Sequence, residues 1–242
     1  MNLVVDVGNT LVKMAVFENH EILFDQAVDA QYFLEKVKVL FAKYPNISQA
    51  IVSSVGQIGQ KEAKILSLFC TVHELTHQSK LPFKNSYATP QSLGVDRIAL
   101  AAAAFYKYPK SNVLIIDAGT CITYDIVNDY GEYLGGAISP GIQMRYNAMH
   151  QQTAKLPLLT PSETLDYIGN STENCMHSGV LNGTAREVDG VIDQYNERFE
   201  HLTVILTGGD AQIFGKRVKN SIFAHSKILL EGLNYLLEYN KR

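Results

Sequence analysis

The sequence contains no apolar run near the roughly 20 residues that a membrane-spanning helix requires. It reaches Asp6 after only a few apolar residues, so no cleavable leader is expected. Cysteine is scarce: Cys70, Cys121 and Cys175 lie far apart and show no CxxC spacing. Three scattered thiols argue against a disulfide framework and a zinc ribbon. These absences predict a cytoplasmic protein without a membrane partner.

Clusters of positive charge are also missing. The chain has 21 Lys and Arg residues against 24 Asp and Glu residues, and its formal net charge is −3. Without a basic patch, the sequence carries no electrostatic footprint for DNA or RNA, so nucleic acid is not an expected partner. The chain does have ample apolar material, because 46% of its 242 residues are hydrophobic. We expect a globular protein of one large domain or two small ones.

Two short acidic turns of the same design are the main feature of the sequence. Asp6-Val7-Gly8-Asn9-Thr10 and Asp117-Ala118-Gly119-Thr120 each end one apolar run and lead into another, which predicts strand, turn and strand. Such a turn offers backbone N–H groups to an anion and a carboxylate to a hydrated divalent cation. A single copy is explained as well by the preference of tight turns for Asp and Gly. Two copies, one at the start of each half, favour binding of a polyphosphate.

The predicted elements repeat in the same order in the two halves. The first half has strands around its acidic turn and at 21–28 and 49–54, helices at 31–44, 60–69 and from 94 to near 109, and a loop at 78–92. The second half has strands at 112–118, 120–128, 132–139 and 202–207, helical parts at 141–151 and 172–198, and a short and a last helix after Asp210. This order indicates α/β layers in two domains, 1–109 and 110–242.

Five segments carry a family resemblance over nearly the whole chain. They are Asp6 to Lys13, Gly94 to Arg97, Ile116 to Thr120, Gly135 to Gly141 and Leu206 to Ala211. With these segments the chain resembles the type III pantothenate kinases of the actin-like ATPase superfamily. The resemblance implies an α/β fold of two duplicated actin-like (ribonuclease H-like) domains, each a mixed sheet flanked by helices, with ATP held between them. It also implies phosphorylation of pantothenate to 4′-phosphopantothenate, the first step of coenzyme A biosynthesis, by a homodimer that uses ATP with Mg²⁺ and a monovalent cation, K⁺ or NH₄⁺.

The first acidic turn has the groups that a triphosphate needs, since phosphoryl transfer depends on positioning and charge neutralisation. Asp6 suits Mg²⁺, Gly8 allows close approach of the backbone, and Lys13 suits phosphate oxygens, although strand alternation alone leaves it open as an exposed lysine. By resemblance, Asp117 is a ligand of the monovalent cation, and Gly208-Gly209 lets adenosine lie close to the backbone. The ATP-binding residues implied are Asp6, Val7, Gly8, Asn9, Thr10, Leu11, Val12, Lys13 and Thr120.

The segment Gly94-Val95-Asp96-Arg97 opens a predicted helix and suits the acceptor substrate. Arg97 offers a planar fork for a carboxylate, and Asp96 suits the proton of an attacking hydroxyl. Capping of the helix explains Asp96 equally well by residue preference, and the resemblance decides for the proton acceptor. The substrate-binding residues implied are Tyr87, Gly94, Val95, Asp96, Arg97 and Thr172. Ordinary loop packing remains the alternative for Tyr87.

Rival functions rest on weaker patterns. His73-Glu74-Leu75-Thr76-His77 fits the HExxH string of zinc proteases, but the β-branched residues around it disfavour the helix that this motif needs. A nucleotide-gated interaction or regulatory module of the actin-like type is the non-catalytic alternative. Asp96 and Arg97 discriminate against it, because a switch has no need of a base beside a carboxylate-binding arginine. A sugar or another hydroxy acid is the alternative acceptor.

Overall fold

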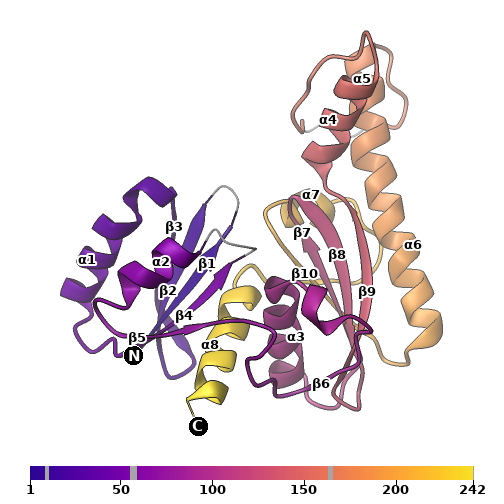
Figure 1. Cartoon of the computed structure of the whole chain (residues 1–242). Coiled ribbons are helices and arrows are strands. Elements are labelled where there is room, and N and C mark those ends of the chain that lie inside the picture. The colour runs from indigo at the N-terminus through magenta and orange to yellow at the C-terminus, as the bar shows by residue number, and fades with distance from the viewer. Residues whose placement is uncertain (9–10, 55–58, 163–165, 242) are drawn as a thin grey trace. The chain divides into compact units, whose positions relative to one another are not determined.

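The computed structural model describes residues 1–8, 11–54, 59–162 and 166–241, and the chain divides into two compact units (Figure 1). Unit 1 comprises Met1–Pro109, Gly131–Tyr133 and Lys227–Arg242, and unit 2 comprises Lys110–Tyr130 and Leu134–Ser226. The change of unit at residue 110 lies where the sequence predicts a domain boundary. The last helix, in contrast, packs with unit 1, although the sequence assigns it to the second domain.

Unit 1 is built on a five-stranded mixed sheet with the order β3-β2-β1-β4-β5. The strands are β1 (Asn2–Val7), β2 (Val12–Glu18), β3 (Glu21–Val28), β4 (Gln49–Ser54) and β5 (Thr71–Glu74). The first three strands are antiparallel neighbours, whereas β4 runs parallel to β1 and β5 runs parallel to β4. The central strand β1 is buried along its whole length, because helices cover both faces of the sheet. A short strand, β6 (Lys84–Asn85), pairs with Glu132 and Tyr133 of the same unit.

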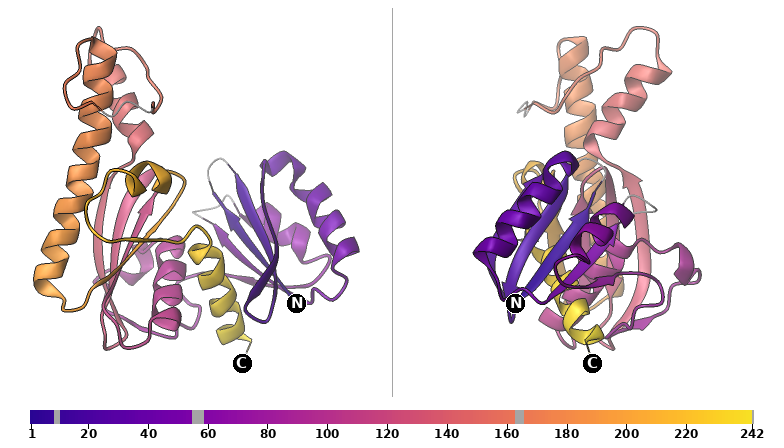
Figure 2. Two further views of the ribbon diagram at one scale, coloured as in Figure 1. Left: turned by 180° about the vertical axis from the view of Figure 1, so that it is seen from behind. Right: turned by 60° about the vertical axis from the view of Figure 1, so that its left-hand side comes forward.

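The helices of unit 1 cover both faces of this sheet, with α1 and α2 on one face and α8 on the other (Figure 2). They are α1 (Phe33–Lys43), α2 (Gln60–Leu66), α3 (Val95–Lys107) and α8 (Ile228–Asn240), with 3₁₀ turns at Ala30–Tyr32 and Pro90–Ser92. Alanines 101 to 104 of α3 are fully buried, and α3 packs closely on α8. The contact is so close that a Cβ atom at Gly232 would lie 1.9 Å from the carbonyl oxygen of Ala99. Small residues therefore fix the position of α3, which begins at the predicted acceptor segment.

Unit 2 repeats the strand order of unit 1. Its strands are β7 (Val113–Ala118), β8 (Cys121–Val127), β9 (Glu132–Pro140), β10 (Thr203–Thr207) and β11 (Phe223–Ala224). They are arranged in the order β9-β8-β7-β10-β11. The third, second, first, fourth and fifth strands of the unit therefore lie side by side, as they do in unit 1. The pairing of β7 with β8 is antiparallel, and those of β7 with β10 and of β10 with β11 are parallel. The duplicated order predicted from the sequence is thus present.

The helices of unit 2 are α4 (Ile142–Gln152), α5 (Thr172–His177), α6 (Gly183–Arg198) and α7 (Ala211–Gly215). The sequence predicts one helical region over 172–198, and the structure interrupts it with a π-helical turn at Ser178–Asn182. Figure 1 shows α4, α5 and the beginning of α6 extending beyond the ends of the strands. The core of the unit lies between the sheet and α6 and includes the fully buried Tyr146 and Phe214. Two mixed sheets flanked by helices confirm the predicted fold class.

Candidate active site

Asp6 lies at the centre of the first predicted site, near the carboxyl end of β1. Strand pairing places Lys13 of β2 opposite Asp6 on one side and Ser53 of β4 opposite it on the other. The Lys13 Nζ atom is 3.9 Å from Asp6 Oδ2, so the lysine lies on the same face as the aspartate. This register answers the question that strand alternation leaves open for Lys13. Sequence reasoning missed Ser53, because its position beside Asp6 depends on the parallel pairing of β4 with β1, which leaves no motif in the sequence.

The charge state of Asp6 depends on this environment. Burial raises the pKa of the Asp6 carboxyl above its ordinary value, and the nearby Asp96 carboxylate raises it further. The Lys13 ammonium and a hydrogen bond from Ser53 act in the opposite direction, but the net shift of the pKa is upward. A buried carboxylate that repels a second carboxylate favours a cation beside it, because the cation relieves both costs. Asp6 therefore has the electrostatics of a site that receives positive charge.

The turn that follows Asp6 is only partly within the described residues. The N–H of Gly8 donates to the carbonyl oxygen of Leu11 at 3.1 Å and closes the turn. Asn9 and Thr10, both predicted to bind ATP, lie outside the described residues. Val7 and Val12 have side chains that are only 3% and 1% exposed and belong to the core of unit 1. For a phosphate these two valines have only backbone groups to offer, and Leu11 is exposed.

The N-terminus of α3 holds Asp96 in a defined position. Gly94 is the N-cap residue, and Asp96 Oδ1 accepts a hydrogen bond of 2.8 Å from the N–H of Arg97. A Cβ atom at position 94 would lie 2.3 Å from Asp96 Oδ1, so the carboxylate folds back over the glycine. The positive end of a 13-residue helix favours the ionised carboxylate. Capping and proton acceptance are therefore compatible roles for Asp96.

Arg97 and Tyr87 are brought together, as the predicted acceptor site requires. The Arg97 guanidinium carbon lies 5.6 Å from the centre of the Tyr87 ring, which is cation–π geometry. Arg97 is 6% exposed, and the half-buried Tyr87 also contacts the ring of Tyr133. Val95, the first residue of α3, is buried. The contact with the ring restricts the guanidinium, which favours recognition of a carboxylate by a bidentate pair.

A cavity of about 440 Å³ opens beside Gly94 and Val95, between the ends of β4 and β5 and the start of α3. Its polar lining includes Ser54, Gln91 and Ser92, together with Glu74 and His77 of the HExxH string. His73 and Glu74 lie on strand β5, and His73 Nε2 is hydrogen bonded with Ser79 Oγ at 3.0 Å. The strand confirms that this string has no zincin helix. No group of three or more His, Cys, Asp or Glu residues suited to a metal occurs among the described residues.

The second acidic turn, in unit 2, is closed by backbone hydrogen bonds. The N–H of Gly119 donates to the Cys121 carbonyl at 2.9 Å, and the N–H of Gly141 donates to the Thr120 carbonyl at 3.2 Å. A Cβ atom at Gly141 would lie 2.3 Å from the Gly119 carbonyl oxygen, so this glycine is needed for the close approach. Asp117 is half-buried, and Thr120 is exposed. The turn thereby brings two of the five predicted segments together.

The glycine pair after β10 adjoins the same turn. Thr207 pairs with Asp117, and Gly208 follows with a φ of 96°, a conformation that side chains disfavour. A Cβ atom at Gly208 would also lie 2.5 Å from Asp117 Oδ1. The N–H of Asp210 donates to the Ala118 carbonyl at 2.9 Å, and burial raises the pKa of the Asp210 carboxyl. Sequence reasoning assigned no role to Asp210, although it stands inside a predicted segment.

Thr172 stands apart from these groups in the chain and belongs to unit 2. It is the first residue of α5, is exposed, and follows the N-cap Ser171, whose hydroxyl accepts the N–H of Asn174 at 3.2 Å. Tyr87, Gly94, Val95, Asp96 and Arg97 all belong to unit 1. The structure thus collects five of the six predicted acceptor residues in one unit.

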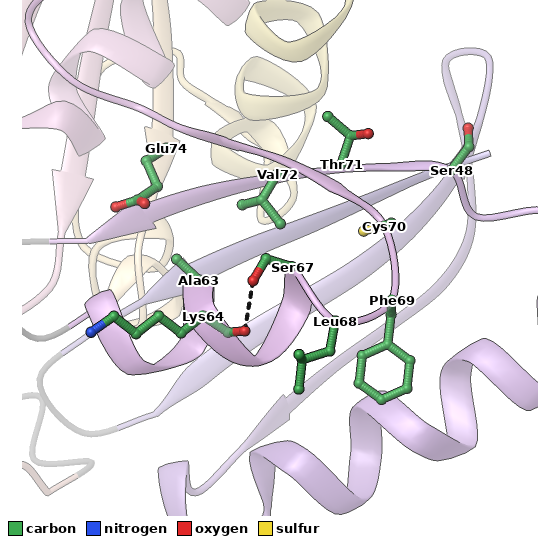
Figure 3. Close-up of a pocket in the computed structure, with 10 residues that line it drawn as sticks. All are labelled: Ser48, Ala63, Lys64, Ser67, Leu68, Phe69, Cys70, Thr71, Val72 and Glu74. Carbon is green, nitrogen blue, oxygen red and sulfur yellow. Dashed lines mark hydrogen bonds between the residues drawn. The ribbon is translucent and has the colours of Figure 1, made fainter.

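A larger hollow of about 720 Å³ lies elsewhere in unit 1, beside the edge strand β5 (Figure 3). Its wall runs from α2 through Ser67, Leu68 and Phe69 to β5, and Ser67 Oγ donates to the Lys64 carbonyl at 2.8 Å. Burial raises the pKa of the Cys70 thiol in this wall to about 11, so the thiol stays protonated and is a poor nucleophile at neutral pH. None of the predicted site residues lines this hollow, whereas Gly94 and Val95 line the cavity at the start of α3, so the hollow is separate from the predicted chemistry.

Comparison with known proteins gives a consistent result. The family model for type III pantothenate kinase matches residues 2–194. The type III pantothenate kinase of Christiangramia forsetii is 51% identical over 241 residues, covering 100% of this chain and 99% of that protein. The enzyme of the same description from Flavobacterium johnsoniae is 47% identical over 239 residues, covering 99% and 98%.

Solved structures agree on the fold. A Campylobacter jejuni protein described as a Baf family transcriptional activator has a TM-score of 0.67 at 20% identity, covering 99% of this chain and 98% of that one. At this level of identity the likeness concerns the fold alone. Together with the duplicated strand order, it and neighbours from Listeria monocytogenes and Clostridium difficile, with TM-scores of 0.54 and 0.57, agree with the predicted actin-like fold. Among the helices of the described residues, none has the length and apolar character needed to cross a membrane.

Proposed function

Since the chain belongs to the type III pantothenate kinase family, we propose how its residues carry out the reaction of that family. The protein is an ATP-dependent phosphotransferase that converts pantothenate to 4′-phosphopantothenate, the first step of coenzyme A biosynthesis. The chain covers nearly the whole length of its relatives, and the five segments that carried the resemblance are all present. This outcome favours the kinase over the nucleotide-gated module.

Asp96 accepts the proton of the primary hydroxyl of pantothenate. The hydroxyl oxygen attacks the γ-phosphorus of ATP, the bond from that phosphorus to the bridging oxygen breaks, and ADP leaves. In a loose transition state the proton is transferred late, so a strong base is not required. The observation that supports this role best is the fixed Asp96 carboxylate at the start of α3, next in the chain to Gly94 and Val95, which line the cavity. The second oxygen, Oδ2, is the one available to the acceptor.

Asp6 holds Mg²⁺, and Lys13 binds phosphate oxygens. Mg²⁺ in kinases is held by one or two carboxylates together with phosphates and water. A single buried carboxylate that favours a nearby cation fits that pattern, and a cage of three protein ligands is not needed. When bound, Mg²⁺ neutralises the charge of the transferring phosphates. Val7, Gly8, Asn9, Thr10, Leu11 and Val12 complete the phosphate-binding turn, with the two valines acting through their backbone.

The second turn serves the monovalent cation and the nucleotide. We assign K⁺ or NH₄⁺ to the Asp117 carboxylate and ATP to Thr120. Support comes from the close packing of Gly208 on Asp117 and of Gly141 on the turn, which leaves backbone oxygens and a carboxylate in one place. Hard oxygen ligands of this kind suit alkali cations. The exposed Gly209 gives adenosine a backbone surface without side chains.

Arg97 binds the carboxylate of pantothenate, and Tyr87, Gly94, Val95 and Thr172 complete the acceptor site. The stacking of Arg97 on Tyr87 supports this assignment. Because Thr172 belongs to the other unit, its contribution comes from the same chain or from the second copy of a homodimer. We place the enzyme in the cytoplasm, where ATP and the pathway that uses its product are found.

Release of ADP with a panel of acceptors tests these proposals. Pantothenate, a sugar and a related hydroxy acid are compared, each with K⁺, with NH₄⁺ and with neither. Of the three acceptors, we expect only pantothenate to support turnover, and only when K⁺ or NH₄⁺ is present. Asp117→Asn should weaken the dependence on K⁺ while leaving the acceptor preference intact. Turnover with another acceptor would refute the specific activity, and turnover with none would favour the interaction module.

A further inference from the structure

A second buried side chain stands beside Asp6 and has no part in the mechanism so far. Ser53 is the register partner of Asp6 across the parallel pair of β1 and β4, and it is 1% exposed. In-register residues of neighbouring strands point to the same face of a sheet. As a hydrogen-bond donor beside Asp6, the Ser53 hydroxyl acts to lower the pKa of that carboxyl. A buried hydroxyl without a partner is costly, so the neighbouring carboxylate accounts for a buried serine directly after the apolar residues 50–52 of this strand.

The two charged neighbours of Asp6, Lys13 and Asp96, do not fix the orientation of its carboxylate. Lys13 approaches to 3.9 Å, which is too long for a hydrogen bond, and its side chain is 52% exposed. Asp96 carries the same charge as Asp6 and repels it. Between a loosely held cation and a repelling anion, the carboxylate needs a short and directional partner. Of the described neighbours across the adjoining strands, Ser53 supplies one.

We infer that Ser53 is a positioning residue, whose hydroxyl holds the Asp6 carboxylate in the orientation in which it receives Mg²⁺. The inference rests on the proposed role of Asp6 as a Mg²⁺ ligand, and it adds Ser53 as the residue that orients this ligand. Such outer partners orient metal ligands, and their loss costs about 10- to 100-fold in metal affinity or activity. Ser53 itself touches neither Mg²⁺ nor the acceptor. Its removal therefore changes the response to Mg²⁺ and leaves the affinity for pantothenate unchanged.

The test measures ADP binding by calorimetry as a function of Mg²⁺ concentration, and the KM for pantothenate separately. Ser53→Ala should raise the Mg²⁺ concentration for half-saturation about 10-fold or more. Ser53→Cys keeps the volume with a weaker donor, and serves if the alanine variant does not fold. Ser48→Ala, an exposed serine just before β4, is the matched control and should match the wild type.

Asp6→Asn is combined with Ser53→Ala in a double-mutant cycle. If Ser53 acts through Asp6, its substitution has no further effect on Mg²⁺ dependence once Asp6 is changed. An unchanged Mg²⁺ response in Ser53→Ala and Ser53→Cys, with Asp6→Asn impaired, would overturn this inference and leave the proposed function standing. An unchanged response in Asp6→Asn itself would overturn the role of Asp6 and the inference with it. An equal loss in both backgrounds would show that Ser53 acts independently.

Discussion

Gly94→Ala separates the position of the Asp96 carboxylate from the stability of the fold. The new Cβ atom would lie 2.3 Å from Asp96 Oδ1, whereas ordinary contacts begin near 3.4 Å. The carboxylate must therefore move by about 1 Å, and a displacement of that size costs on the order of 100-fold in rate. The backbone at position 94, with φ −56° and ψ 135°, suits alanine without strain. Alanine is a poorer N-cap residue than glycine, so stability should fall, but by no more than about 1 kcal/mol.

The assay compares kcat with the free energy of unfolding in urea. Gly190→Ala is the control, because a Cβ atom there meets nothing within 4 Å in helix α6. That variant should gain stability and keep its kcat. A Gly94→Ala enzyme with wild-type kcat would refute the claim that the held position of Asp96 matters. Loss of kcat together with a loss of stability well beyond about 1 kcal/mol would show that the glycine has a structural role instead.

Three other substitutions test separate parts of the structure. Asp6→Asn should abolish turnover yet raise the melting temperature at neutral pH, because burial raises the pKa of this carboxyl and its ionised form is therefore destabilising. That gain should fade as the pH falls through the raised pKa of Asp6 and be gone below the ordinary pKa of an aspartate, and a gain that grows in acid would contradict it. Gly232→Ala should destabilise unit 1 by about 1–3 kcal/mol, since its Cβ atom meets the Ala99 carbonyl at 1.9 Å, and unfolding in urea measures this. Arg97→Lys should raise the KM for pantothenate about 10-fold without changing the KM for ATP, because a lysine cannot form a bidentate pair; an unchanged KM would remove Arg97 from the acceptor site.

Local features of the fold were predictable because they depend on neighbouring residues. The strand at Gln49–Ser54 has the predicted bounds, and the segment around His73, whose β-branched residues disfavour a helix, is not helical. The π-helical turn at Ser178–Asn182 was not predicted, since its side chains continue the pattern of the helices on either side. The place of α8 depends on Gly232 meeting Ala99, residues far apart in the chain. Contacts of that kind leave no local signal.

The candidate site likewise combines residues that sequence motifs mark with residues that only the fold brings together. Sequence motifs singled out Asp6, Lys13 and Asp96 as separate groups, and the structure supplies the register and the helix start that bring them near one another. Ser53 has no motif of its own, because its importance comes only from being level with Asp6 on a parallel strand. The catalytic and binding roles of all these residues, and those of Tyr87 and Thr172, stay predictions.

The most direct test of the proposed chemistry is Asp96→Asn, assayed for pantothenate phosphorylation with the binding of pantothenate and of ATP measured in parallel. General base groups contribute about 10²- to 10⁴-fold to rate, so kcat should fall by that factor. Both ligands should still bind, because the amide keeps the size of the carboxylate and Arg97 is unchanged. A variant that phosphorylates pantothenate at the wild-type rate would contradict the role of Asp96 as proton acceptor.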